Sequence, residues 1–456
     1  MASNGGIPVN GLLNGIKKGT TILTAEPFVF VLSQQQRKER CDQCFKSCKI
    51  SRCAGCQYVF YCGRNCQREA WSIHKVECPN IKRIHPRILP DASRMMARII
   101  IKLSQNGKEE RGYYTPQKYR VFHDLMSHVL DIKGDMKKME HFTALSLILA
   151  EFLPKDMLPD VKELLGIFGR MSVNSFNILD TDMTSLGVGI YLGPSIIDHS
   201  CKPNCSAIFE GTTIIIRTLC DITSFDWSEV RITYIDVLKD TNTRRAELKK
   251  SYYFLCECER CNCPETIEIA AACPNKECTY PCQSRDSHCI KCGEKFSKGF
   301  AECFDEVSEL SAFHLDKMSH TAYLDTARLC LEKQKGVLHP YNLLVVRMLE
   351  MALAAAMDLK RWEDAEKYAA QLTARYLFYF GETHPMTGQV HFVRAKLLSS
   401  QKKGRLALEY ITKAAQLIKI SFGDDHSKMK YEVRPLLDQL LAEYHLEKHQ
   451  DVTDQS

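Results

Sequence analysis

Cysteine and histidine residues recur at metal-ligand spacing between residues 41 and 78, and this pattern constrains the fold more than any other feature. They read C-x2-C-x8-C-x2-C-x5-C-x3-C-x7-H-x3-C and comprise Cys41, Cys44, Cys53, Cys56, Cys62, Cys66, His74 and Cys78. Eight such ligands make two closed tetrahedral sites, the composition of structural rather than catalytic zinc. A segment this short cannot bury much core, so zinc is predicted to hold it folded.

Disulfide bonds are the alternative use of so many cysteines, and the expected location argues against them. The first residues, MASNGGIPVNG, have no basic region followed by an apolar one, so no secretory signal is expected. No apolar run approaches the ~18 residues that a membrane span needs. We therefore expect a protein of the nucleus or cytoplasm, without a membrane partner. Thiols stay reduced there, so the clustering of many of the 22 cysteines is expected to reflect metal binding.

The segment around this cluster is basic. Residues 37–87 contain twelve Lys or Arg against four Asp or Glu, whereas the whole chain carries a net charge of +6. A basic face attracts acidic partners, nucleic acid included. Alternatively, these cations offset the charge of zinc-bound thiolates. No base-reading motif accompanies them, so nucleic-acid binding is the weakest interpretation.

Periodicity outside the cysteine clusters predicts alternating strand-rich and helical parts. At 456 residues the chain exceeds one ordinary core, which predicts several domains. Residues 21–32 (TILTAEPFVFVL) predict a strand, apolar spacing predicts helix over about 92–170, and short strands return over 171–238. Prolines beginning with Pro79 are expected to mark the exit from the first cluster. Beyond residue 300 the pattern is helical.

The helical tail contains an internal repeat. Ala365 and Tyr368 recur as Ala407 and Tyr410, 42 residues later. GETHP (381–385) and GDDHS (423–427) repeat at the same interval, and GVLHP (336–340) is a degenerate copy. Small residues at matched points let paired helices approach closely, and the Gly-x-x-His element turns the chain. The pattern resembles a tetratricopeptide (TPR) array with a long period; a simple helical bundle is the alternative.

A second cysteine-rich region ends in a further set of spaced thiols. Cys273, Cys278, Cys289 and Cys292 have zinc-ribbon-like spacing, with Cys263 and Cys282 as substitutes. The spacing predicts an additional zinc site; reduced free thiols on a loop are the alternative.

The first cluster resembles the MYND zinc finger at every ligand, with Tyr61 before Cys62 and Trp71 before His74. The resemblance implies two interleaved sites. One would use Cys41, Cys44, Cys62 and Cys66, and the other Cys53, Cys56, His74 and Cys78. Cys48 fits no ligand position. The resemblance also implies binding of proline-containing peptides.

Four downstream motifs extend the resemblance over nearly the whole chain. They are GVGIY (187–191), DHSCKPNC (198–205), VRITYID (230–236) and YYFLCECERC (252–261). Singly, none is specific. Their order and the closing C-x-C-x2-C resemble the SET methyltransferase core with its post-SET zinc loop. Together with the finger, they resemble the SET-and-MYND (SMYD) family, in a divergent form.

This resemblance implies an α+β fold, in which a SET β-fold core is interrupted by a MYND zinc finger and a helical insert. A zinc-bound post-SET loop and a C-terminal α-helical TPR-like repeat domain would follow. The expected boundaries are 1–36 for the N-terminal part of the SET domain, 41–78 for the finger, 80–170 for the insert, 171–238 for the SET core, 250–264 for the post-SET loop, 273–292 for the zinc-ribbon-like insert and 300–456 for the helical repeat.

The same resemblance implies methyl transfer from S-adenosylmethionine to a protein lysine. This reaction is an in-line displacement, so the amine must arrive neutral and aimed. A narrow apolar channel with a phenol desolvates the ammonium and orients its nitrogen. Period-two alternation predicts that Val230, Ile232 and Tyr234 share one face of a strand. By resemblance Tyr234 is the catalytic tyrosine, and Tyr252 and Phe254 are walls of the lysine channel and cofactor pocket.

The remaining site residues are also implied by the resemblance. His199 would lie against the adenosyl group and Asn174 would reach the methionine end. Asn10, Gly11, Asp198, Tyr234 and Phe254 would complete the cofactor contacts. Cys201, Cys256, Cys258 and Cys261 would form a third zinc site that ties the post-SET loop over the substrate, leaving Cys205 as a spare.

Departures from the family pattern gather at the cofactor contacts. ProValAsnGly (8–11) stands where relatives carry an Arg-Gly-x-Gly type turn, and Asp198 replaces an asparagine. Only Glu229 survives of a Gly-Glu-Glu turn, and Met126 and His128 stand where polar contacts are usual. Three lost contacts of about 1 kcal/mol each exceed two factors of ten in affinity.

Two functions therefore compete. The first is a protein-lysine methyltransferase acting on a histone or another protein. The second is a catalytically weak or inactive SET-fold scaffold that binds protein partners through the finger and the helical repeat. The retained Tyr234, His199, Asn174 and post-SET thiols favour the enzyme.

Overall fold

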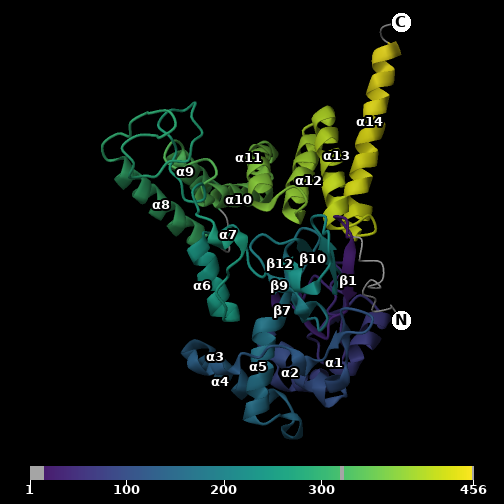
Figure 1. The fold of residues 1–456 in the computed structure, drawn as a ribbon. Coiled ribbons are helices and arrows are strands. Elements are labelled where there is room, and N and C mark those ends of the chain that lie inside the picture. Colours follow the sequence, from purple (N-terminus) through teal and green to yellow (C-terminus); the bar gives the residue numbers. More distant parts are fainter. Residues whose placement is uncertain (1–14, 319–322, 454–456) are drawn as a thin grey trace. The chain divides into compact units, whose positions relative to one another are not determined.

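The computed structural model describes residues 15–318 and 323–453 (Figure 1), and the chain divides into two compact units. Unit 1 takes residues up to 199 together with 203–232 and 248–254, and unit 2 takes 200–202, 233–247 and the residues from 255 onward. The mixture of short strands and many helices has the α+β composition expected from the sequence. Asn10 and Gly11, expected to contact the cofactor, lie outside the described residues.

Unit 1 is built on small sheets of short strands. The strands outside the finger and the helical insert are β1 (Thr21–Ala25), β2 (Val29–Leu32), β7 (Ser175–Leu179), β8 (Ser185–Ile190), β9 (Asp198–His199), β10 (Cys205–Glu210), β11 (Thr213–Thr218) and β12 (Arg231–Ile232). One antiparallel sheet has the order β1-β11-β10 and another has the order β2-β8-β7, while β9 and β12 pair in parallel.

The single strand expected over residues 21–32 is wrong. The segment breaks after Ala25 into β1 and β2, which join different three-stranded sheets. Pro27 lies at the break and cannot donate a hydrogen bond to a strand ladder. Apolar residues lie on both sides of the break, so the apolar pattern alone did not reveal it.

The helical part of unit 1 is interrupted, contrary to the continuous helical pattern expected over 92–170. Its helices are α1 (Arg64–Ile84), α2 (Asp91–Ser104), α3 (Val129–Gly134), α4 (Met136–Phe152) and α5 (Val161–Asn174). Between α2 and α3 the chain forms a short hairpin of β5 (Gly112–Tyr113) and β6 (Tyr119–Arg120). Turn-forming residues in this stretch, among them Gly107 and Pro116, end the helix.

Pro79 does not mark the exit from the first cluster, since α1 continues through it to Ile84. A proline inside a helix costs about 3 kcal/mol. Beyond it, Ile81 and Ile84 are buried in the core that the finger shares with α2, α4 and α5. The apolar burial of this last turn offsets the cost of the proline.

The finger packs directly on the sheet of unit 1, which explains the glycine of the GVGIY motif. A Cβ atom at Gly187 would lie 2.2 Å from the carbonyl oxygen of Val31 and 2.9 Å from the ring of Phe45. Phe45 belongs to the finger and meets Phe30 of β2 edge to face, with 5.6 Å between ring centroids. Only glycine admits this close approach.

Unit 2 contains most of the remaining helices. They are α7 (Glu259–Asn262), α8 (Phe300–Lys317), α9 (Leu324–Gln334), α10 (Leu343–Asp358), α11 (Trp362–Phe380), α12 (Pro385–Ser400), α13 (Gly404–Ser421) and α14 (Arg434–Thr453). A further helix, α6 (Thr241–Tyr252), lies partly in each unit. From α10 to α13 consecutive helices lie side by side (Figure 1). None of the helices in the described ranges is both long and apolar enough to cross a bilayer.

The sequence repeat corresponds to a structural repeat. Ala365 of α11 and Ala407 of α13, which match in the sequence, are both fully buried. The three Gly-x-x-His elements place a glycine at positive φ, at Gly336, Gly381 and Gly423. In each, the histidine Nδ1 accepts a hydrogen bond from the backbone N–H two residues on, at 3.1–3.2 Å, and the histidines are His339, His384 and His426.

These histidine acceptors predict acid sensitivity of the helical part of unit 2. Burial lowers the pKa of His384 to about 4, and burial also lowers the pKa of His339. The unfolded chain therefore binds more protons as pH falls below about 6.5, the ordinary value for histidine. The stability contributed by neutral His384 is complete above pH 6.5 and is lost as the pH falls towards 4. Loss of such a helix cap costs about 0.5–2 kcal/mol.

We expect His384→Asn to flatten this pH dependence, because asparagine accepts the same hydrogen bond without titrating. The effect is measured by monitoring the thermal unfolding of α10–α13 through hydrogen exchange, once at pH 7 and once at pH 5, and comparing the stabilities at the two pH values. Equal pH dependence in the variant and the natural chain would contradict the assignment.

Candidate functional site

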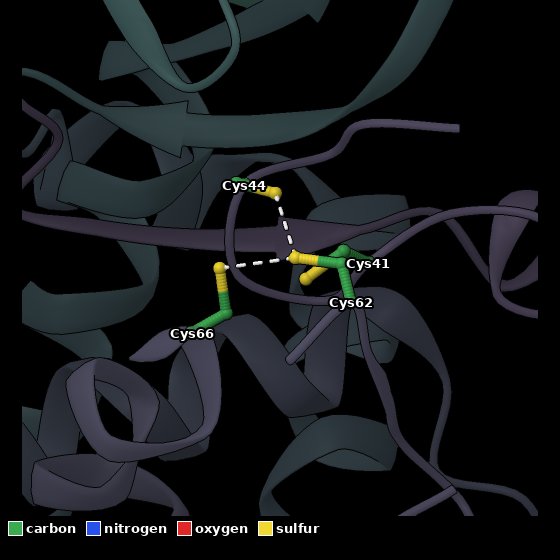
Figure 2. A group of neighbouring side chains, drawn as sticks. All are labelled: Cys41, Cys44, Cys62 and Cys66. Carbon is green, nitrogen blue, oxygen red and sulfur yellow. Dashed lines mark hydrogen bonds between the residues drawn. The ribbon is translucent and has the colours of Figure 1, made fainter. Parts of the chain in front are cut away.

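Cys41, Cys44, Cys62 and Cys66 come together as the first expected tetrad. Figure 2 shows their sulfur atoms turned towards one another. The Sγ atoms of Cys44 and Cys62 are 3.8 Å apart, those of Cys62 and Cys66 are 3.4 Å apart, and all four lie within 4.8 Å of one another. A tetrahedral ion with Zn–S bonds of about 2.3 Å places its sulfurs about 3.8 Å apart, so this group fits zinc.

The second tetrad interleaves with the first, in the pairing implied by the resemblance. The Sγ atoms of Cys53 and Cys78 are 3.8 Å apart, and His74 Nε2 lies 3.4 Å from Cys53 Sγ and 3.7 Å from Cys56 Sγ. All four residues are buried. The opposite ring atom, His74 Nδ1, is 3.3 Å from Glu77 Oε2. Glu77 thereby orients the imidazole so that Nε2 faces the thiols.

A buried ion network connects both tetrads to α2. Arg94 donates to Asp42 at 2.6 and 2.9 Å and to Glu77 at 3.1 and 3.2 Å. Arg98 donates to Glu77 and Asp42 at 2.8 Å each and to the Phe30 carbonyl at 2.7 Å. Asp42 follows the ligand Cys41, and Glu77 precedes the ligand Cys78. The sequence signal for this network was a pair of arginines four residues apart, within the mostly apolar stretch from Met95 to Ile101 of α2, and no prediction was made from it.

Electrostatics keep this network ionised. Burial alone would raise the pKa of the Asp42 carboxyl, but the attraction of Arg94 and Arg98 outweighs it and holds that pKa below its ordinary value. The same balance lowers the pKa of Glu77 well below its ordinary value. Two carboxylates therefore face two guanidinium groups without a net buried charge.

Cys201, Cys256, Cys258 and Cys261 form a third tetrad, wholly within unit 2. Cys201 Sγ lies 3.5 Å from Cys261 Sγ and 4.0 Å from Cys256 Sγ, which again fits zinc. Arg244 of α6 is fully buried beside it. It donates to Cys261 Sγ at 3.6 Å and to Glu265 Oε1 at 2.9 Å. Arg244 thus offsets the negative charge of the thiolates, a role that no spacing in the sequence indicated.

Cys273, Cys278, Cys289 and Cys292 also come together in unit 2, with every Sγ within 4.8 Å of the others. Cys263 is exposed and does not belong to the group. Cys282 is buried next to it but is not one of the four.

Several expected cofactor residues lie near one another in unit 1. His199 is buried at the end of β9, where its register partner is Ile232 of β12. Its ring centroid is 6.1 Å from that of Phe254. Asn174, the last residue of α5, donates to the carbonyl oxygens of Met126 and Arg170 at 2.8 Å each. Asp198 is exposed at the start of β9.

Tyr234 is not on a strand, so the predicted shared face with Val230 and Ile232 is wrong. β12 contains only Arg231 and Ile232, and Tyr234 lies in a bend two residues beyond it. Thr233 Oγ1 donates to the carbonyl of Ile235 at 2.6 Å, which turns the chain at this point. Tyr252 is the last residue of α6, and both tyrosines are partly buried.

No role was expected for Tyr253 from the sequence, because the family resemblance assigned roles to its neighbours Tyr252 and Phe254. Its backbone adopts a left-handed φ of 63°, and its ring centroid is 5.2 Å from that of His128. Its hydroxyl oxygen is buried without a hydrogen-bond partner in the structure, and burial raises the pKa of this phenol. Buried hydroxyls normally have a partner, so this atom is a candidate ligand contact.

The residues that depart from the family pattern have structural neighbours of their own. The Met126 side chain is 62% exposed. His128 Nδ1 lies 2.9 Å from Asp131, and Trp227 packs edge to face against Tyr114 and Phe225. Of these residues, His128 lies beside Tyr253 and the Met126 carbonyl accepts from Asn174.

Comparison with known proteins identifies the finger directly. The family model described as the MYND finger matches residues 41–78, the range predicted from the ligand spacing.

Curated relatives match over most of the chain. Histone-lysine N-methyltransferase ASHR1 of Arabidopsis thaliana is 28% identical over 446 residues, covering 94% of this chain and 92% of the relative. Histone-lysine N-methyltransferase SMYD3 of Mus musculus is 27% identical, covering 90% of each chain. N-lysine methyltransferase SMYD2-A of Xenopus laevis is 27% identical, covering 90% of this chain and 91% of the relative.

Proposed function

We propose that this chain is a divergent member of the SET-and-MYND (SMYD) family and that it transfers methyl groups from S-adenosylmethionine to lysines of protein substrates, histones or others. The observation that carries the proposal is similarity to lysine methyltransferases over about nine tenths of both chains, with a MYND finger inside it. The strand-rich part of unit 1 is assigned as the SET core and the helices from α8 onward as a TPR-like domain.

The residues of unit 1 fit the cofactor. An adenosyl group packs against apolar and aromatic side chains, and the neighbouring rings of His199 and Phe254 supply two of these. The polar methionine end of the cofactor needs hydrogen-bonding groups, and Asn174 and the unpartnered hydroxyl of Tyr253 supply these. The bound cofactor would supply an activated methyl group on a sulfonium.

The chain's own residues have separate tasks in this proposal. His199, Phe254, Asn174 and Asp198 hold and orient the cofactor. Tyr252 and Phe254 exclude water from the lysine channel, which lowers the pKa of the lysine ammonium. The Tyr234 phenol orients the neutral amine for in-line attack. The third tetrad orders the post-SET loop, which carries the channel residues.

Tyr234→Phe tests the catalytic assignment. Removing one orienting hydroxyl is expected to lower kcat for methyl transfer by about 100-fold or more and to weaken S-adenosylmethionine binding far less, because Tyr234 is only one of several expected cofactor contacts. Transfer of labelled methyl to a histone mixture measures kcat, and calorimetry measures binding. Tyr323→Phe is the matched control, because its side chain is 58% exposed and carries no assigned role.

Calorimetry of the natural chain also separates the two competing functions. Saturable binding of S-adenosylmethionine supports the enzyme. No saturable binding at millimolar cofactor would contradict it and favour a SET-fold scaffold, which the exposed Met126 and Asp198 side chains support.

Partners at the finger and the helices follow from the same assignment. The MYND finger is a protein-interaction module. We propose that it binds proline-containing peptides, a role supported by Trp71, whose ring is 48% exposed on α1 and packs on the ligand His74. The helical array would bind further protein partners, and we place the protein in the nucleus or cytoplasm.

A further inference from the structure

Residues 273–299, which lie between α7 and α8, pack around buried cysteine side chains. From residue 273 to residue 299, all of which the structure describes, the buried side chains are those of Cys273, Cys282 and Cys289. Tyr280 and Phe296 are the partly buried aromatic residues packed against them. So small an apolar interior cannot hold a loop in one conformation without a further constraint.

Four thiols of this segment have the arrangement of a tetrahedral metal site. Cys273 Sγ is 3.5 Å from Cys292 Sγ, and Cys278 Sγ is 3.9 Å from Cys289 Sγ. These separations match those of the two finger tetrads and the value of about 3.8 Å expected around zinc. Cys282 instead donates to the carbonyl of Tyr280 at 3.6 Å.

The backbone supplies an independent observation, because it repeats the loop that holds the finger thiols. The N–H of Gly293 donates to the carbonyl of Cys289 at 2.8 Å, and Gly293 has a φ of 76°. In the finger, Phe45 donates to the Cys41 carbonyl at 3.0 Å with a φ of 60°, and Gln57 donates to the Cys53 carbonyl at 3.0 Å with a φ of 57°.

A second bond completes the likeness to the loop at Cys41. Cys41 donates to the carbonyl of Lys46 at 3.1 Å, and Cys289 donates to the carbonyl of Glu294 at 2.8 Å, five residues on in both cases. In this tight turn, two cysteines that are separated by two residues point their thiols at the same position. The two finger loops lie within the MYND match, so the third copy of the turn indicates the same ligand.

We propose that Cys273, Cys278, Cys289 and Cys292 bind a fourth structural Zn2+ ion. Four thiolates with no water position form a closed site, which is structural rather than catalytic. This assignment stands on the residues of unit 2 alone and is independent of the proposed methyl transfer.

The ion would also order the first turn of the helical array. Three backbone bonds join the stretch before Cys273 to the α9–α10 connection: Ala272 to Val337 at 2.9 Å, His339 to Ala270 at 3.0 Å and Leu343 to Glu268 at 2.9 Å. His339 Nε2 also lies 3.1 Å from the carbonyl of Thr279, inside the zinc loop. Zinc therefore holds in place the carbonyls of Glu268, Ala270 and Thr279, which accept hydrogen bonds from the α9–α10 connection.

Metal analysis of the purified, reduced full-length chain tests the proposal. We expect four zinc ions in the natural chain, one for each tetrad, and three in Cys292→Ser, which alters an exposed ligand. Cys282→Ser is the matched control and should retain four, because its thiol is buried in the same loop without being a ligand. Three ions in the natural chain, or iron in place of zinc, would overturn the assignment. Loss of zinc in Cys282→Ser with retention in Cys292→Ser would overturn the ligand set.

Hydrogen exchange provides a second measurement, because it shows which parts of a variant remain folded. In Cys292→Ser the amides of residues 270–282 and 337–343 should exchange about tenfold faster or more, while those of α12 and α13 stay unchanged. Unchanged exchange in both loops would contradict the ordering role. Methyl-transfer activity has no part in either readout, so failure of the proposed function would leave this result unaffected.

Discussion

Removing zinc with excess chelator at neutral pH is expected to unfold residues 41–84 and to leave α12 and α13 protected from hydrogen exchange. The buried apolar side chains of residues 41–78, apart from cysteines, are Phe45, Val59, Tyr61 and Ala70. Structural zinc contributes about 10–16 kcal/mol per ion in isolated finger peptides, so the two ions together outweigh the roughly 6–12 kcal/mol that four such side chains contribute. Protection of the β3–β4 hairpin (Ser51–Arg52 and Phe60–Tyr61) should therefore fall by about 1000-fold or more.

A pair of serine variants gives the matched control. Cys53→Ser removes a buried ligand and should reproduce the loss of protection, because an open tetrad binds zinc poorly. Cys48→Ser alters an exposed thiol of the same segment and should behave like the natural chain. A finger that stays protected without metal would show that its packing on unit 1 suffices to hold it folded.

Arg94→Met is expected to be the most destabilising substitution outside the zinc ligands, at about 3–5 kcal/mol. The guanidinium of Arg94 is buried and bridges Asp42 and Glu77, so its removal leaves a buried carboxylate short of its partner. The change also frees the residues that flank Cys41 and Cys78. Both unfolding midpoint and zinc release should shift, and urea unfolding with a chromogenic chelator measures the two.

Arg87→Met separates this effect from the loss of any arginine. Arg87 pairs with Glu151 at the surface, where both side chains are about half exposed or more, and exposed pairs contribute little. We expect no measurable change in stability or zinc release. If Arg94→Met behaved like Arg87→Met, the buried network would not couple the finger to α2.

The sequence predicted the zinc chemistry well because ligand spacing is a local property. Turns such as those at Cys41 and Cys289 bring two thiols together through the backbone of five or six residues. The interleaving of the two finger sites and the use of distant Cys201 with Cys256, Cys258 and Cys261 came from family resemblance, since pairing between remote segments leaves no local mark. The Gly-x-x-His repeat was likewise visible, because its cap forms within three residues.

Other features were decided by tertiary structure. Apolar composition could not separate β1 from β2, since both strands carry buried apolar residues and they differ in the sheet they join. Packing on the shared core carries α1 through Pro79, against the local cost of the proline. The network of Arg94, Arg98, Asp42 and Glu77 joins residues up to 56 positions apart, and Arg244 reaches the third tetrad across 17.

The sequence by itself determined which thiols and imidazoles are available to hold metal, because their spacing is written along the chain. Only the tertiary structure decided which buried charges support those ligands and that Tyr234 follows a strand rather than lying in it. The physical reason is that a buried charge is stable only beside its partner, and partners are brought together by the folded chain.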